Sequence, residues 1–98
     1  MNAQQASAPE NVVFVGTKPP MNYVLAVVTL FNGGSPVVVL RARGKAISRA
    51  VDVAELVRHK FVDKCTVQSV AIGTERVQNE NHRTVNVSSI EIHLARQA

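Results

Sequence analysis

The sequence predicts a single α/β (α+β) domain in which two strand–helix pairs are followed by a β-hairpin. Three observations support this prediction: β-branched runs that end at glycine or charged residues, two segments of helical character, and strand-like residues on both sides of a polar turn. Strand–helix–strand units connect parallel strands through right-handed crossovers. We therefore expect a mixed four-stranded sheet with two helices on one face and a protruding antiparallel hairpin.

The first strand is expected at Asn11–Val15, a β-branched and aromatic run that ends at a glycine. Residues 1–10 are interpreted as a flexible tail, and residues 11–98 as one domain that is long enough for its own core. Residues 16–20 form a loop, because two consecutive prolines lack backbone donors and disfavour helical dihedrals at the residue before each. Pro20 nevertheless suits the first turn of a helix.

That helix should run from about Met21 to Asn32, where two glycines that tolerate positive φ end it. It is apolar nearly all round, so we expect it to be covered on more than one side. The next strand begins with Val37–Leu40, an apolar run that is typical of a strand buried on both faces. It continues into Arg41 and Arg43, which share a face, so the strand leads from the core to a charged surface.

An amphipathic helix is expected from about Ala46 to Phe61. Its apolar residues recur at three- and four-residue steps, and its polar face carries Glu55 and Arg58 at the spacing of an ion pair. This pattern predicts one face against the sheet and one face in water. The apolar positions are Ile47, Ala50, Val51, Ala54, Val57 and Phe61.

The last third of the sequence predicts a hairpin with arms at Thr66–Val77 and Thr84–Leu94 and a polar tip at residues 78–83. In the second arm, the parity of the apolar residues changes at Ser88 and Ser89, which indicates a β-bulge or a strong twist. We therefore expect the tip half of the hairpin to leave the plane of the sheet and to protrude as an arm.

The positive charge is concentrated in one segment of the chain. Residues 18–49 contain five basic and no acidic residues, residues 50–98 contain six of each, and residues 1–17 contribute only Glu10. The net charge of +4 therefore lies in one segment. This distribution is typical of a surface that binds a polyanion, and a solvated basic face without a ligand is the alternative.

The sequence contains no phosphate-binding glycine loop, no dinucleotide fingerprint and no histidine or cysteine spacing for a metal. We therefore expect no enzymatic activity, no metal and no cofactor. Cys65 is the single cysteine and is interpreted as a small buried hydrophobe. The apolar runs are too short to span a membrane, and residues 1–10 do not resemble a signal peptide, so we expect a cytoplasmic protein.

A nucleic-acid partner would be bound mainly through its phosphates. The chain has four aromatic residues, and all except Tyr23 fall at apolar positions, so the sequence predicts no platform for stacking bases. Basic side chains would contact the phosphate backbone with little readout of sequence. Asn22 and Tyr23 lie beside Lys18 at the predicted helix start, where they either help to bind phosphate or serve only as a cap and a residue at the edge of the core.

Three motifs in the chain resemble the Alba family of archaeal chromatin proteins: Gly16–Val24 (GTKPPMNYV), Arg41–Asp52 (RARGKAISRAVD) and Val87–Ile92 (VSSIEI). The resemblance extends from about Asn11 to Leu94. It implies a fold like the C-terminal domain of a bacterial translation initiation factor, in agreement with the predicted order of elements. It also implies a homodimer that binds double-stranded DNA with little sequence preference, with hairpin arms that reach the minor grooves; many members also bind RNA.

The resemblance also implies roles for single residues. Phe61 matches an aromatic that the family uses for contacts between dimers on DNA; alternatively, it is only the last apolar residue of its helix. Thr17 replaces the first lysine of the family's Gly-Lys-Lys-Pro loop, the lysine associated with acetylation, so this control and one phosphate contact are lost here. The implied nucleic-acid-binding residues are Lys18, Arg41, Arg43, Lys45 and Arg49 in the body, Asn22 and Tyr23 as secondary contacts, and Arg76 and Arg83 in the arm.

We therefore hypothesise that the protein is a dimeric chromatin protein that coats DNA in the nucleoid. The resemblance also implies that dimers assemble with one another on DNA and that a heterodimer with a paralogue can form. Glu75 and Glu80 lie near Arg76 and Arg83 in sequence, so we expect a moderate, salt-sensitive affinity. An RNA-directed role, as a chaperone or a ribonucleoprotein subunit, is the alternative and would use the same residues. A third hypothesis, a small-molecule-binding or enzymatic α/β domain, lacks the signature of a polar pocket.

Overall fold

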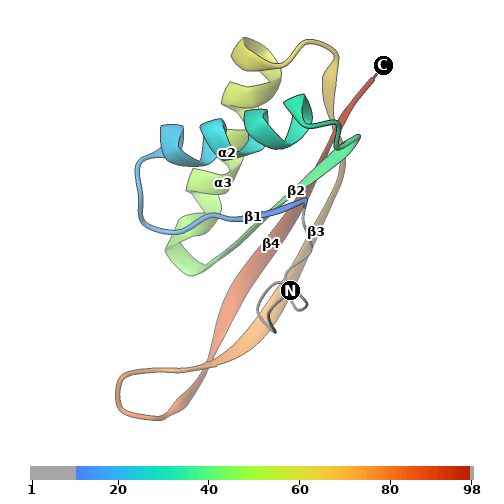
Figure 1. The fold of residues 1–98 in the computed structure, drawn as a ribbon. Helices are drawn as coiled ribbons and strands as arrows, with labels where there is room; N and C mark the ends of the chain where they lie inside the picture. The colour runs from blue at the N-terminus through green and yellow to red at the C-terminus, as the bar shows by residue number, and fades with distance from the viewer. Residues whose placement is uncertain (1–10, 98) are drawn as a thin grey trace, which may run out of the picture.

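In the computed structural model, which describes residues 11–97, two helices cover one face of a four-stranded sheet (Figure 1). The strands lie in the order β1-β2-β4-β3; β1 and β2 are parallel, and the other pairs are antiparallel. The predicted fold class is confirmed, while the predicted tail at residues 1–10 lies outside the described residues. The elements are β1 (Val12–Phe14), α2 (Pro20–Asn32), β2 (Val37–Arg43), a 3₁₀ turn (Gly44–Ala46), α3 (Ile47–Leu56), a π-helical turn (Val57–Phe61), β3 (Cys65–Gln78) and β4 (Thr84–Arg96).

The hydrophobic core lies between the helices and the central strands. Val38 and Leu40 on β2 pair with Leu94 and Ile92 on β4, and strand alternation directs all four side chains to the face that the helices cover. All four are buried. The run that the sequence predicts as buried on both faces is therefore the centre of the sheet, where β2 lies between β1 and β4.

Helix α2 is buried along one face. Val24, Val27 and Phe31 recur at three- and four-residue steps and are buried, whereas Leu25 is 60% exposed. The helix packs against both α3 and the sheet, as expected for cover on more than one side, but its outer face is left uncovered. The helix ends at two glycines as predicted, and Gly34 is the one with positive φ.

The second helical segment follows its predicted span, but two of its apolar residues do not face the core. Ala50 and Val57 are buried as predicted, whereas Val51 and Phe61 are nearly half exposed. Phe61 leaves the core-facing stripe that helical periodicity predicts because the last turn widens: the N–H of Val62 donates to the carbonyl of Val57 at 2.9 Å, five residues back. This π-helical turn moves Phe61 out of the regular helical stripe.

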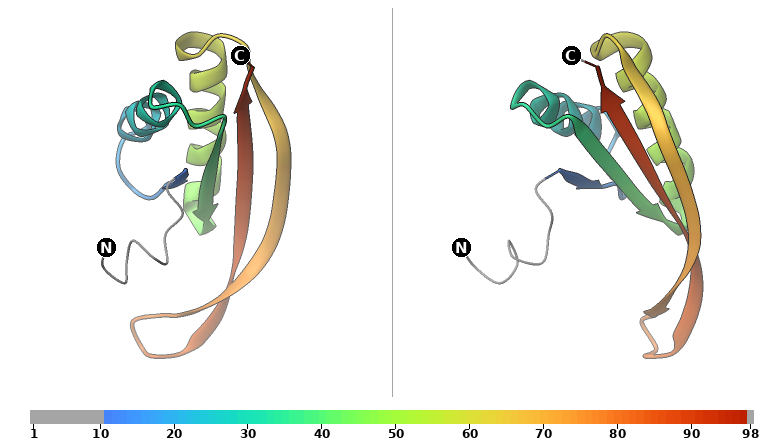
Figure 2. Two further views of the ribbon diagram at one scale, coloured as in Figure 1. Left: turned by 45° about the vertical axis from the view of Figure 1, so that its right-hand side comes forward. Right: turned by 90° about the vertical axis from the view of Figure 1, so that its right-hand side faces the viewer.

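The hairpin continues past the sheet body as a two-stranded arm, residues 74–88 (Figures 1 and 2). β2 ends at Arg43, opposite Ser89 of β4, and the part of β4 nearer the tip pairs with β3 alone. Both views in Figure 2 show this arm reaching beyond the ends of β1 and β2. The prediction of a protruding arm is therefore confirmed.

Of the two alternatives predicted at Ser88–Ser89, a bulge or a strong twist, the bulge is wrong, because β3 and β4 pair without interruption there. The register shift lies instead in β3, between Val67 and Ser69. The apolar parity of β4 changes for another reason. Beyond Arg43, neither β2 nor the helix-covered core fixes which face of the strand must be apolar.

Candidate nucleic-acid interface

The loop between β1 and α2 is folded around one tyrosine hydroxyl. Tyr23 is half-buried in the first turn of α2, and its oxygen accepts hydrogen bonds from the backbone N–H groups of Gly16 and Lys18, both at 3.0 Å. The neighbouring Asn22 has an exposed side chain, and its N–H donates to the carbonyl of Pro19. Tyr23 therefore shapes the loop, and the side chain of Lys18 is left exposed.

Arg49 holds the same loop from the other helix. Its Nη1 donates to the carbonyl oxygen of Gly16 at 2.8 Å, and the residue is only partly exposed. The loop is thus fixed from α2 by Tyr23 and from α3 by Arg49. This bond is made by one of the two terminal guanidinium nitrogens, so donors remain for a second partner.

Replacing Tyr23 with Phe is expected to loosen this loop without unfolding the protein. The change deletes the acceptor of two N–H groups, and a typical hydrogen bond contributes about 0.5–1.5 kcal/mol to stability. We expect unfolding by denaturant to show a loss of about 1–2 kcal/mol, with faster amide exchange at Gly16 and Lys18. Thr29→Val, which removes an exposed hydroxyl bonded within α2, should leave exchange in the loop unchanged. Equal exchange rates in both variants would contradict the positioning role.

Arg41, Arg43 and Lys45 come together where β1 and β2 end. Gly44 adopts a φ of 59°, which side-chain-bearing residues rarely adopt, and turns the chain from β2 into the 3₁₀ turn that carries Lys45. The three cationic side chains are exposed and border an open depression of about 550 Å³, the basic depression. Phe14, Gly16, Thr17 and Glu75 also line it.

An ion pair connects the basic depression to the base of the arm. Arg43 Nη1 lies 3.4 Å from Oε1 of Glu75. Both side chains are well exposed, so the pair contributes little to stability, but it places a carboxylate among the cations. Successive strand residues point to opposite faces, so Glu75 offsets the charge of Arg43 rather than that of its sequence neighbour Arg76.

Arg76 and Arg83 lie on the arm, separate from the basic depression. Arg76 is paired opposite Asn86, and Arg83 lies at the tip just before β4. The tip is held by Asn79, whose side-chain oxygen accepts hydrogen bonds from the N–H groups of Asn81 and Arg83 at 3.0 Å. Both arginines are exposed, so the arm carries two cationic positions beyond the body.

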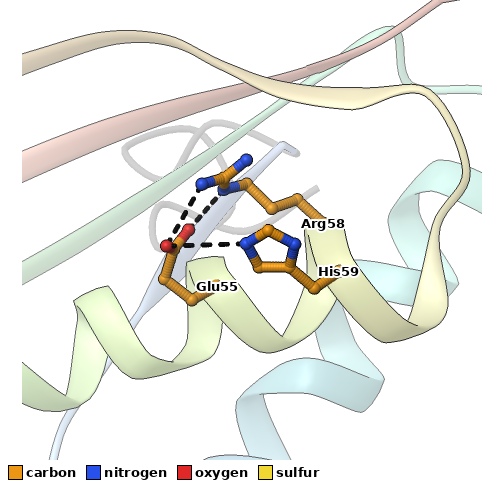
Figure 3. A network of polar contacts seen from close by, with 3 residues as sticks. All are labelled: Glu55, Arg58 and His59. Atoms are coloured by element: carbon orange, nitrogen blue, oxygen red, sulfur yellow. Dashed lines mark hydrogen bonds and ion pairs between the residues drawn. The ribbon is translucent and has the colours of Figure 1, made fainter.

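Phe61 ends the helical segment that begins at the 3₁₀ turn carrying Lys45. Its side chain is 46% exposed, so the alternative of a purely internal residue is wrong. Nearby, Glu55 forms ion pairs with Arg58 and, at 3.7 Å, with His59 (Figure 3). The hydrogen bond from the Arg58 guanidinium holds the pKa of Glu55 below its usual value.

Glu55→Gln is expected to lower stability slightly, and only above acidic pH. A carboxylate whose pKa is depressed in the folded state stabilises the fold above its unfolded pKa, and the contribution is lost as the pH falls through the folded pKa. Wild type and variant should therefore differ in denaturant midpoint at neutral pH and converge in strong acid. A difference that persists in acid would show that the side chain acts through packing instead.

Three further findings concern cysteine, metals and membranes. Cys65 is buried at the start of β3 as predicted, and burial raises the pKa of its thiol. Among residues 11–97, no three His, Cys, Asp or Glu side chains are placed to hold a metal ion. In that same part of the chain, no helix is long and apolar enough to cross a membrane.

Comparison with known proteins identifies the family. A family model described as Alba matches residues 11–74. The DNA/RNA-binding protein Alba of Methanocella arvoryzae is 55% identical over 87 residues, which cover 89% of this chain and 91% of that protein. The chain belongs to the Alba family. The DNA/RNA-binding protein Alba 1 of Archaeoglobus fulgidus is 57% identical over 88 residues, 90% of this chain and 98% of that protein.

Solved structures of Alba proteins share this fold. Alba from Thermoplasma volcanium superposes with a TM-score of 0.83 at 53% identity, covering 88% of this chain and all of that one. ALBA1 from Trypanosoma brucei gives a TM-score of 0.73 at 26% identity, covering 91% of this chain and 71% of that one. The resemblance to the Alba family is therefore confirmed in sequence and in fold.

A further residue of this Alba chain departs from the sequence prediction. Phe14 is expected at an apolar position, yet its side chain is 59% exposed on the wall of the basic depression. Its neighbours Val13 and Val15 are buried, so alternation along β1 turns Phe14 to the opposite face. Residues 12–15 are all apolar, so the sequence does not show which of them face the core.

Proposed function

We propose that this chain binds nucleic acid, without catalysis, through phosphate contacts that depend little on base sequence. The observation that carries the proposal is the basic depression, where Arg41, Arg43 and Lys45 lie together at the root of the arm. Cationic side chains that displace condensed counterions bind the backbone of any sequence. The relatives from Methanocella and Archaeoglobus are named DNA/RNA-binding proteins, which supports the same class of ligand.

We assign the phosphate contacts of the body to the basic depression and to Lys18, which extends from the loop beside it. Arg49 combines a contact of this kind with its bond to the loop, whereas Asn22 is an exposed secondary contact. Tyr23 contributes indirectly, because its hydroxyl is engaged by the loop backbone. The arginines of the arm fix its orientation on the duplex.

A homodimer is part of this proposal. β3 carries a row of apolar residues, the β3 stripe, which consists of Val67, Val70 and Ile72. These residues pair with residues of β4 that face the helices, but β3 itself is an edge strand of the sheet. The stripe is exposed in the single chain, and Ile72 is 84% exposed. A second copy that covers the stripe removes this apolar surface from water and fixes two arms relative to each other.

Larger assembly follows from the same reasoning. The exposed Phe61 is proposed to contact neighbouring dimers along DNA, and a paralogue with a matching stripe is proposed as a heterodimer partner. The protein would then act as an architectural component of the nucleoid in the cytoplasm. Double-stranded DNA is the proposed main ligand, and the names of the relatives favour RNA as the second.

Two unrelated labelled duplexes of equal length test the proposed function in a titration at low salt. The phosphate-contact mechanism predicts dissociation constants that agree within about twofold, because backbone contacts carry no sequence information. A strong preference for one sequence, or no binding, contradicts the proposal. Adding unlabelled structured RNA or duplex as competitors then ranks the two ligands.

Glu75→Gln is expected to strengthen duplex binding by about two- to fivefold at low salt, because it releases Arg43 from an ion pair of the strength typical at surfaces. The gain should shrink as salt screens the charges. Glu55→Gln, which makes the same charge change on α3, is the matched control and should show a smaller gain. Equal gains would mean that net charge, and not the ion pair with Arg43, sets the affinity.

A further inference from the structure

We propose that Phe14 and Arg41 form a stacking site for one unpaired base, so that the basic depression binds a single-stranded nucleotide as well as a duplex backbone. This inference rests on the nucleic-acid binding proposed above and specifies a further ligand for the same surface. It differs from phosphate binding in the groups involved, because an aromatic ring and a guanidinium plane recognise the face of a base.

The geometry brings an aromatic ring and a cation together on an open surface. Phe14 is paired with Arg41 across the parallel strands β1 and β2, so both side chains project from the same face of the sheet. The guanidinium carbon of Arg41 lies 5.7 Å from the centroid of the Phe14 ring, within the range of a cation–π contact. The ring is nevertheless 59% exposed, so surface remains on it for a second planar group.

The surroundings of Phe14 suit a nucleotide better than a purely apolar ligand. The depression of about 550 Å³ that the ring borders falls within the usual size of small-molecule sites. Arg43 and Lys45 on its wall are placed to bind a phosphate, while Glu75, its one carboxylate, is already paired with Arg43. An aromatic face and cationic side chains in one depression are the two elements of single-strand recognition.

The site selects against paired bases. In a duplex both faces of each internal base are covered by its neighbours in the stack, so a side chain on a protein surface cannot stack on them unless the stack is opened or the base is flipped out. The ligand of this site is therefore an unpaired nucleotide, in RNA or in single-stranded DNA. Its base lies on Phe14 and Arg41, and its phosphate lies toward Arg43 and Lys45.

Phe14→Leu tests the stacking directly, because it keeps an apolar side chain and removes the aromatic face. One base–aromatic stack corresponds to a loss of at least about fivefold in affinity. We expect a loss of this size for unstructured oligoribonucleotides or single-stranded DNA, and a smaller loss for duplex DNA. Phe14→Tyr, which keeps the aromatic face, should restore single-strand affinity. Parallel titrations with RNA and DNA strands show which source of unpaired bases binds more tightly.

Tryptophan at the same position provides a readout that does not depend on affinity. The chain contains no tryptophan, so Phe14→Trp introduces a single tryptophan, whose fluorescence a stacked base should quench. Leu25→Trp, at an equally exposed position on α2, is the control and should not be quenched. The inference is overturned if the wild type does not bind single strands. It is also overturned if Phe14→Leu weakens the binding of single strands and duplex equally and the fluorescence of Phe14→Trp is not quenched. A failure of the proposed function is distinguishable, because duplex binding by the wild type would then be absent too.

Discussion

Reversing the charges of Arg43 and Lys45 together is expected to weaken duplex binding at least about tenfold at low salt, and equally for unrelated sequences. Both side chains are exposed on the wall of the basic depression, and neither is part of the core. Each phosphate contact contributes about 0.9 to the slope of log K against log salt, so losing two contacts should flatten the slope by about 2 for each chain of the proposed dimer that contacts the duplex. Fluorescence anisotropy with two labelled duplexes measures both effects.

The control for this variant carries the same change in net charge at the other end of the body. Lys60 lies in the π-helical turn and Arg96 at the end of β4, and both are exposed. Reversing these two charges should leave the salt slope close to that of the wild type. If both double variants lose affinity equally, the basic depression is not the binding surface. If only one duplex loses affinity, the contacts read sequence.

Ile72→Asp is expected to convert the proposed homodimer into a folded monomer. A carboxylate in the β3 stripe would have to be buried without a partner when two copies associate, whereas it costs little in the single chain, where Ile72 is 84% exposed. Sedimentation equilibrium should therefore give the mass of one 10.6 kDa chain for the variant and twice that mass for the wild type.

Duplex affinity should fall by at least about tenfold when dimerisation is lost, because a monomer lacks the second set of contacts that a dimer holds in place. Leu25→Asp places the same charge on a similarly exposed apolar position of α2 and should remain dimeric. Circular dichroism checks that both variants are folded. A wild type that is monomeric at binding concentrations, or an Ile72→Asp variant that remains a dimer, contradicts the proposed interface.

The element order could be predicted from the sequence because local patterns determine it. Glycines and prolines mark the ends of the strands and helices, and the run at Val37–Leu40 has the composition of a central strand. The polar residues at the hairpin tip correctly separate the last two strands. These signals act over a few residues, which is the range at which a single sequence is informative.

The features that were missed depend on distant parts of the chain. The ion pair of Arg43 with Glu75 spans 32 residues and follows from the register of β2, β4 and β3, which no local pattern encodes. The outward direction of Phe14 rests on a strand of three residues, too short for alternation to be evident. The position of Phe61 depends on a π-helical turn that helical periodicity does not predict.

The candidate site was predicted in its residue types more completely than in its roles. Arg41, Arg43 and Lys45 form the basic depression, as their clustering in sequence suggests. Tyr23 and Arg49, by contrast, bind the backbone of the loop that carries Lys18. A sequence shows that a cation or a hydroxyl is present, but the packing of α2 and α3 decides which of these groups is engaged within the protein.

The central claim, that phosphate contacts dominate binding, is tested most directly by the salt dependence of duplex affinity. The measurement is the slope of log K against log salt for two unrelated duplexes and the wild-type protein. Each neutralised phosphate contributes about −0.9 to this slope. From the contacts of the body and the arm we therefore predict a slope of roughly −4 or steeper, with the same value for both sequences. A flat response, or no binding at low salt, would show that the basic depression is only a solvated face and would contradict the proposed function.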